Sequence, residues 1–139
     1  MNNAITKNNK SLKPYILIQG YKNTITIGKD VIRLLNFPDH ICFSVNDTNG
    51  SILMFPCNED NVMAFKVPEN LFTNSKTVFR ITSKSFVCGI MKKYGLSLSE
   101  VYSYSGVPIT ENSILFSLMP DNQQILKTSN SKRVPAKLT

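Results

Sequence analysis

The sequence lacks the motifs by which most nucleotide-dependent and metal-dependent enzymes are recognised. Its 139 residues contain no Walker loop, no G-x-G-x-x-G pattern and no cluster of suitably spaced metal ligands. His40 is the only histidine. Asp39 beside it, or Ser103 and Ser105 near Tyr102, form a triad only on paper, because nothing in the sequence brings the members together. We therefore predict a protein that is not an enzyme and uses no cofactor or metal.

The sequence is also poor in cysteine and in long apolar runs. The three cysteines, Cys42, Cys57 and Cys88, include no C-x-x-C pair, and their odd number does not suit a disulfide framework. No apolar stretch approaches the roughly 20 residues that cross a bilayer. Residues 1–7 are polar and lack the apolar core of a signal peptide. We therefore expect structural thiols in a cytoplasmic protein that does not contact a membrane.

Positive charge predominates and is concentrated at the two ends of the chain. The formal net charge is +7. Residues 1–13 carry three basic side chains and residues 122–139 carry four, with no acidic residue in either segment. Residues 14–121 carry nine of each sign. We therefore predict one domain over 14–121 between a flexible basic arm and a flexible basic tail, which either contact phosphates or remain solvated.

The first part of this domain has the pattern of two strands, a helix and a hairpin. Ile25 and Ile27 alternate with threonines, as in a half-buried strand. Val31, Leu34 and Leu35 share one face of a helix. A run of turn-forming residues then separates two apolar segments, which predicts a hairpin. The predicted elements are strands at 15–18 and 24–27, a helix over 29–36, and hairpin strands at 41–45 and 52–55.

The second part repeats this order more loosely. Phe86 and Ile90 belong to an apolar stripe of helical spacing, and Gly95 suits the position just after a helix. Gly106 and Pro108 predict a loop between the last two strands. The predicted elements are strands at 64–67 and 78–81, a helix over 84–94, and hairpin strands at 101–104 and 114–118.

Together the two parts predict an α+β fold of mainly antiparallel strands with two short helices. We interpret the chain as tandem ββαββ-like units, 14–57 and 62–120, because each has the same order of elements. One unit alone has too little apolar surface for a core. Two units related by a pseudo-twofold axis would form one domain with a shared core, as a homodimer does.

Residues 25–37, Ile-Thr-Ile-Gly-Lys-Asp-Val-Ile-Arg-Leu-Leu-Asn-Phe, resemble the strand–helix segment of AbrB/MazE-type swapped-hairpin transcription factors. Gly28 and Asn36 stand where those proteins usually have proline and glycine. The resemblance implies a DNA-binding regulator.

A second resemblance covers residues 15–119. The segments 55–60, 79–84 and 94–96 are similar to those of a group of uncharacterised bacterial and prophage proteins. This resemblance implies an origin in a bacterial mobile element or phage and carries no established activity.

If the first resemblance holds, double-stranded DNA is the expected partner, with a homodimer also open. The basic side chains near the two strand–helix junctions would then lie on one surface. Arg33 and Arg80 are the candidates for base edges, because a guanidinium group can bind guanine through two hydrogen bonds. The predicted nucleic-acid-binding residues are Lys22, Lys29, Arg33, Arg80, Lys84, Lys92 and Lys93.

Two other interpretations remain open at this point. These side chains are ordinary solvated charges if the nine acidic residues of the domain balance them. Alternatively, the chain is a phage-encoded inhibitor that binds a host defence protein, such as a CRISPR effector nuclease, through an unpaired strand edge or its basic ends.

Overall fold

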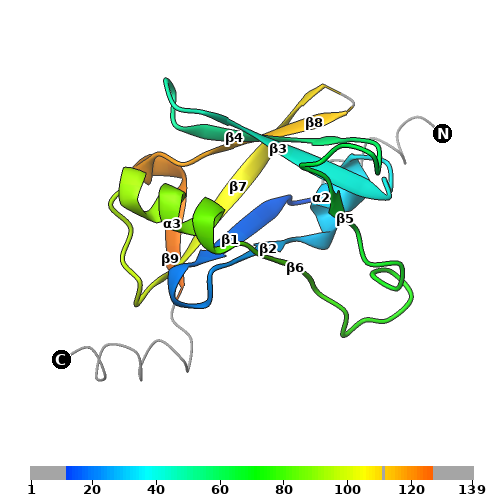
Figure 1. The fold of residues 1–139 in the computed structure, drawn as a ribbon, viewed down its shortest axis with the longest axis horizontal. Coiled ribbons are helices and arrows are strands. Elements are labelled where there is room, and N and C mark those ends of the chain that lie inside the picture. The colour runs from blue at the N-terminus through cyan, green and yellow to red at the C-terminus, as the bar shows by residue number, and fades with distance from the viewer. Residues whose placement is uncertain (1–11, 111, 127–139) are drawn as a thin grey trace.

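The computed structural model describes residues 12–110 and 112–126, which form a mainly antiparallel β structure with two α-helices. Eight strands lie side by side in the order β5-β3-β4-β8-β7-β1-β2-β6, and the sheet curls into a nearly closed barrel. Figure 1 shows β3, β4 and β8 in one layer and β1, β2 and β6 in the other. The strands are β1 (Tyr15–Gln19), β2 (Thr24–Ile27), β3 (His40–Asn46), β4 (Ser51–Pro56), β5 (Phe65–Lys66), β6 (Phe79–Thr82), β7 (Val101–Thr110), β8 (Ser113–Ser117) and β9 (Gln123–Leu126).

The alternating apolar residues of the first strands face the interior, as the sequence predicts. Ile16 and Ile18 of β1 and Ile25 and Ile27 of β2 are almost completely buried. They pack with apolar residues of β4, β6, β8 and both helices in one core. The hairpin predicted at 41–45 and 52–55 is confirmed as β3 and β4, whose turn contains Gly50 at a φ of +63°.

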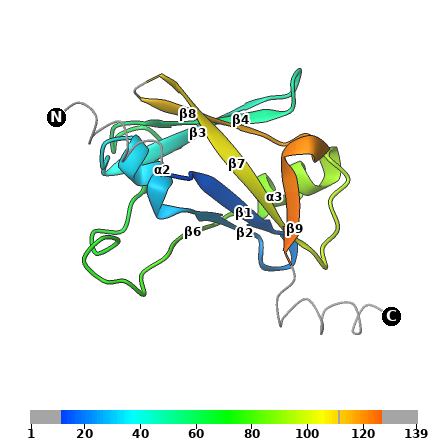
Figure 2. The ribbon, with the colours of Figure 1, turned by 180° about the vertical axis from the view of Figure 1, so that it is seen from behind.

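The two α-helices lie at opposite ends of the barrel (Figures 1 and 2). Helix α2 (Lys29–Leu34) ends two residues earlier than predicted. Asn36 and Phe37 both have positive φ, and the Phe37 N–H donates to the Ile32 carbonyl, which satisfies the end of the helix. Helix α3 (Lys84–Lys93) is followed by Gly95 at a φ of +63°, as predicted. Neither helix is long and apolar enough to cross a membrane.

The predicted loop at Gly106 and Pro108 is wrong, because β7 continues through both residues to Thr110. The first half of β7 pairs with β1 and β9, and its second half pairs with β8. The Gly106 N–H donates to the Pro14 carbonyl, so the backbone of Pro108 faces the same side, beyond the end of β1. Proline is tolerated there because no neighbouring strand needs its missing N–H.

The boundary predicted for the C-terminal tail also needs correction. Residues 123–126 form β9, which pairs with β7. The amide of Asn122 donates to the carbonyls of Ser105 and Ser117, each at 2.9 Å, and the Gln123 amide donates to the Tyr104 hydroxyl at 2.7 Å. These hydrogen bonds hold residues 122–126 against β7, although their composition is that of a flexible tail. The rest of the predicted arm and tail, 1–11 and 127–139, lies outside the described residues.

Candidate nucleic-acid interface

Charged residues are segregated between the two layers of the barrel. Residues 14–29 and 70–99, which form β1, β2, the first residue of α2, β6 and α3, carry seven basic side chains and no acidic one, and Asp30 and Glu100 directly follow them. Residues 34–69, which form β3, β4 and β5, carry five acidic side chains and one basic, Lys66. We call these parts the basic half and the acidic half. The near-zero net charge of the domain therefore hides two parts of opposite sign.

The centre of the basic half is the ribbon of β2 and β6. Phe79 and Ile81 of β6 are buried, whereas Arg80 between them is exposed on the outer face. Thr26 lies in register between Arg80 and Leu17 of β1, but Thr24 and Thr26 are buried, so Arg80 and Thr82 of β6 are the exposed side chains of this ribbon. Four residues of strand span about 13 Å, which is close to the width of the DNA major groove.

Two predicted residues lie together at the Phe79 end of this ribbon. Lys29 and Arg33 of α2 line a hollow of about 310 Å³. The Arg33 guanidinium contacts the Asp30 carboxylate at 2.6 Å and lies 4.9 Å from the centre of the Phe72 ring. These two contacts hold Arg33 in place and neutralise part of its charge, so Arg33 is a poorer candidate for a base contact than Arg80.

Two further predicted residues lie at the opposite end of the ribbon. The Ser83 N–H donates to the Asn23 carbonyl at 2.9 Å, which joins the start of α3 to the start of β2. Lys22 and Lys84 are the chain neighbours of these two residues, and both are exposed. The ribbon therefore has basic side chains at both ends and Arg80 between them.

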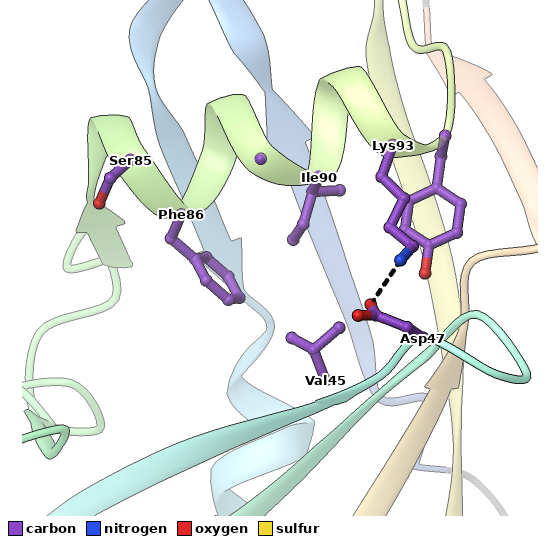
Figure 3. Close-up of a pocket in the computed structure, with 8 residues that line it drawn as sticks. Val45, Asp47, Ser85, Phe86, Ile90 and Lys93 are labelled. Carbon is purple, nitrogen blue, oxygen red and sulfur yellow. Dashed lines mark ion pairs between the residues drawn. The ribbon is translucent and has the colours of Figure 1, made fainter.

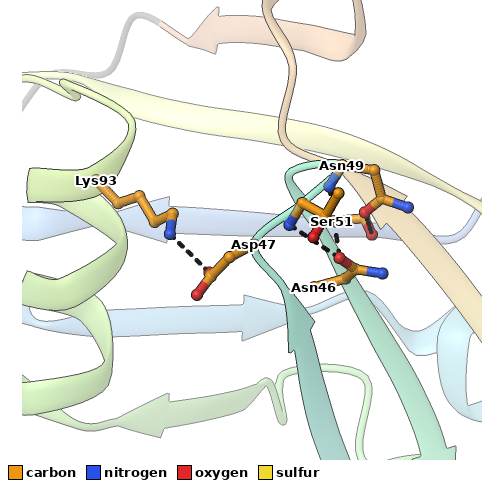
Figure 4. Close-up of polar contacts among 6 residues, drawn as sticks. Asn46, Asp47, Asn49, Ser51 and Lys93 are labelled. Carbon is orange, nitrogen blue, oxygen red and sulfur yellow. Dashed lines mark hydrogen bonds and ion pairs between the residues drawn. The ribbon is translucent and has the colours of Figure 1, made fainter.

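Lys92 and Lys93 lie apart from this group, at the end of α3. Figure 4 shows the Lys93 ammonium group beside the Asp47 carboxylate of the β3–β4 turn, at a distance of 3.0 Å. Lys93 is thus directed toward the acidic half, and Lys92 is exposed. Lys76, which precedes β6, also belongs to the basic half and is not among the predicted residues. The absence of acidic residues from 70–99 was the signal that could have identified it.

One set of side chains that could take part in catalysis does lie together, around a polar hollow in the acidic half. Asp39, His40, Cys57 and Glu59 all line it. The Cys57 N–H donates to the His40 carbonyl at 3.1 Å, so these two residues are cross-strand neighbours. However, burial and a hydrogen bond with Cys42 raise the pKa of the Cys57 thiol to about 11. A nucleophilic cysteine needs the opposite shift, because the thiolate is the reactive form.

The other triad considered from the sequence is not assembled. Ser103 and Tyr102 are successive residues of β7, so their side chains point to opposite faces of the sheet, and Tyr102 is buried. The Tyr102 hydroxyl accepts a hydrogen bond from the Ser97 N–H at 2.8 Å. Within residues 12–110 and 112–126, no three histidine, cysteine or acidic side chains are placed to hold a metal ion.

Comparison with known proteins gives no relative from which a function could be transferred. No family model, no curated protein and no solved structure matches the chain. The function is therefore argued from the geometry and charge of the surface.

Proposed function

We propose that the protein is a non-enzymatic regulator that binds double-stranded DNA through the outer face of the β2–β6 ribbon. The observation that carries this proposal is the segregation of charge, which leaves the basic half without an acidic residue over 14–29 and 70–99. Basic side chains bind phosphates and release the counterions condensed on DNA. The AbrB-like segment 25–37 includes most of β2 and all of α2, which supports the same assignment. Such a regulator would act in the cytoplasm of a bacterium that carries the mobile element.

Some residues of the ribbon would position the protein on the DNA, and another would read the base sequence. Lys22, Lys29 and Lys84 are placed at the ends of the ribbon, where they would contact phosphates on either side of a groove. Arg80 lies in the middle of the ribbon with no acidic partner among the described residues, so its guanidinium would reach a base edge. Because β2 also pairs with β1 and β6 is the last strand of the path, the sheet would approach the major groove by its β6 edge.

We also propose that the barrel consists of two tandem units related by a pseudo-twofold axis. In this interpretation β1 corresponds to β5, β2 to β6, β3 to β7 and β4 to β8. If each strand of the path β5-β3-β4-β8-β7-β1 is replaced by its counterpart, the same path results in the opposite direction. The pairs β4–β8 and β2–β6 each map onto themselves, so both would lie on the axis. This symmetry supports an origin by duplication and would place the DNA-binding ribbon on the axis.

The test is the salt dependence of binding to a labelled DNA duplex, measured by fluorescence anisotropy. The variant Arg80→Gln, Lys84→Gln should bind more weakly, and its slope of log K against log salt should fall by about 0.9, because Lys84 is the phosphate contact of the pair and each such contact contributes about 0.9. Lys66→Gln, in the acidic half, is the matched control and should change neither quantity. Equal slopes for all three proteins would contradict the assignment.

The basic ends need a separate control, because their charge alone can bind DNA. A full-length variant with glutamine in place of all seven basic residues of the two ends should bind more weakly while keeping the effect of Arg80→Gln, Lys84→Gln. These residues are Lys7, Lys10, Lys13, Lys127, Lys132, Arg133 and Lys137. If it binds no DNA at all, the ends and not the ribbon are the binding element. Absence of DNA binding by every form would favour the inhibitor interpretation.

A further inference from the structure

The hollow between α3 and β3 is mainly apolar, and its charge is balanced. It has a volume of about 280 Å³, and Figure 3 shows Val45, Phe86 and Ile90 directed into it. Its two charged lining residues, Asp47 and Lys93, pair with each other. A second hollow, at the end of α2, has a lining of unbalanced charge and therefore restricts the chemistry of a ligand.

This second hollow lies between the end of α2 and the segment 67–72, and its volume is about 140 Å³. Ile32 and Val67 are the buried residues of its lining. Pro38 and Pro68 also line it and restrict the backbone around it. An apolar cavity of about 150 Å³ can hold benzene, so this hollow admits a group of about that size.

Two exposed phenylalanine rings line the hollow and stand at a steep angle to each other. The ring centres of Phe37 and Phe72 are 5.0 Å apart, with an angle of 72° between the ring planes. The face of an aromatic ring attracts cations. Phe72 already makes one such contact, since the Arg33 guanidinium lies 4.9 Å from its centre. Arg33 does not line the hollow, and the Asp30 carboxylate offsets its charge at 2.6 Å.

Phe37 has a backbone conformation that its packing does not explain. Its φ is +55°, in the left-handed region that a bulky residue rarely adopts. Its N–H donates to the Ile32 carbonyl at 2.9 Å, a bond that glycine would make without strain. The Phe37 side chain is 58% exposed, so the core gains little from it. Strained residues cluster at binding sites, and a contact with a ligand would account for this ring.

Two carboxylates, Asp39 and Glu69, complete the lining. Both residues are exposed, and neither has an ion-pair partner in the part of the chain that the structure describes. Lys66 precedes the buried Val67 in an extended segment, so its side chain points to the opposite side of the chain. The hollow thus combines aromatic faces with negative charge, which suits an organic cation.

The backbone of the hollow favours a cation without N–H groups. The carbonyls of Ile32, Asp39 and Pro68 each already accept a hydrogen bond from a backbone N–H. A primary ammonium group brings three donors, and leaving them without acceptors is unfavourable. A quaternary ammonium group brings none and presents methyl groups to the rings.

We infer that this hollow binds a quaternary ammonium group, such as that of choline or of a trimethylated lysine. The methyl groups pack against Phe37 and Phe72. The positive charge is attracted by the ring faces and by Asp39 and Glu69, and the same carboxylates disfavour a ligand with an anionic group beside the ammonium. The inference is independent of the proposed DNA binding, because no residue of the β2–β6 ribbon lines the hollow.

The test is an NMR titration of the full-length, nitrogen-15-labelled protein with choline. Choline should shift the amide signals of residues 37–39 and 67–72 with a Kd of about 1 mM. Dimethylbutanol, the uncharged analogue of choline with a tert-butyl group, and ethanolamine, which lacks the methyl groups, should each bind about tenfold more weakly. A trimethyl-lysine peptide should bind like choline and phosphocholine more weakly, which distinguishes a protein ligand from a lipid headgroup.

Variants test the role of each part of the lining. Phe37→Gly should abolish choline binding without lowering the melting temperature, because glycine adopts the positive φ without strain. Asp39→Asn, Glu69→Gln should weaken binding about tenfold at low salt. The matched control is Glu100→Gln, Asp121→Asn, which removes two carboxylates that do not line the hollow. It should change the Kd less than about twofold.

Three results would overturn the inference. The first is the absence of saturable choline binding up to about 20 mM. The second is equal binding of choline and either of its two analogues. The third is retained binding by Phe37→Gly, or equal weakening by the two carboxylate variants, which would place the cation elsewhere on the surface.

Discussion

The basic half and the acidic half are built from similar elements but present different surfaces. The basic half exposes Arg80 and Thr82 of β6, with lysines at both ends of the β2–β6 ribbon. The acidic half presents a partly unpaired edge, at β3, beside an apolar groove. Elements of one architecture thus provide two kinds of surface, one with basic side chains and one with an unpaired strand edge beside an apolar groove. The charge and edge pairing of each element, and not the fold as a whole, make this difference.

The largest expected effect comes from a substitution in β7 at the point where this strand passes from one half to the other. Strand β7 passes from one layer to the other at Gly106, where a Cβ atom would lie 2.5 Å from the ring of the buried Phe116. Gly106→Val should therefore lower the free energy of unfolding by about 1–3 kcal/mol, the usual cost of overpacking a core.

Urea denaturation measures this change. Gly89→Ala is the control, because its new Cβ meets open space. If both variants lose the same stability, glycine at Gly106 is not required by the close approach of Phe116.

A second experiment asks whether the sign of each half matters or only the total charge. Arg80→Gln, Lys84→Gln removes two positive charges from the basic half and should weaken DNA binding about 10- to 100-fold at low salt. Glu59→Gln, Asp60→Asn removes two negative charges from the acidic half, and we expect a change of less than about threefold, because screening limits the reach of these charges. Anisotropy at constant salt compares the pairs. Opposite shifts of equal size would show that net charge alone determines binding.

A third experiment measures the reactivity of the Cys57 thiol in the acidic half. Because burial and Cys42 raise the pKa of Cys57 to about 11, this thiol holds its proton at pH 8. At this pH it has about 100-fold less thiolate than a thiol of pKa 9. A thiolate of higher pKa is more nucleophilic, which offsets part of this difference. Alkylation of Cys57 should therefore be about tenfold slower than alkylation of a thiol of pKa 9.

Mass spectrometry after iodoacetamide treatment follows this reaction at Cys57. The rate should continue to rise with pH up to about 11, and Cys42→Ala should increase it at pH 8 by removing the hydrogen bond. A rate that levels off below pH 9 would show that the thiol is not shifted.

The smallest expected effect concerns the ion pair between the halves. Lys93 and Asp47 are 44% and 65% exposed, so their coupling should be about 0.2–1 kcal/mol and should decrease with salt. A double-mutant cycle with Lys93→Gln and Asp47→Asn measures this coupling by thermal unfolding. A coupling that is unchanged in 1 M salt would argue against a simple surface ion pair.

Local patterns predicted most of the individual elements and much less of the surface. The strand at 24–27 and the turn at Gly50 each depend on neighbouring residues, and each is confirmed. The half-buried character predicted for that strand is wrong, because Thr24 and Thr26 are buried as well as Ile25 and Ile27. The predicted site residues were expected on one surface, but Lys93 pairs with Asp47. Lys22 and Lys84, in contrast, are the chain neighbours of Asn23 and Ser83, which are joined by a backbone hydrogen bond. Local patterns could not show which of these basic residues lie close together, because their positions in space depend on contacts between segments far apart in the sequence.

The sequence by itself determined where the chain alternates, turns and coils, because these properties follow from side chains a few residues apart. It also determined the order of charges along the chain. Only the tertiary structure decided that β7 runs unbroken through Gly106 and Pro108, and that 123–126 becomes a strand, since both depend on which backbone lies alongside. Strand pairing likewise placed 14–29 next to 70–99 and so gathered seven basic side chains in one half. Local patterning sets the elements, whereas the long-range pairing of their backbones decides which surfaces they form.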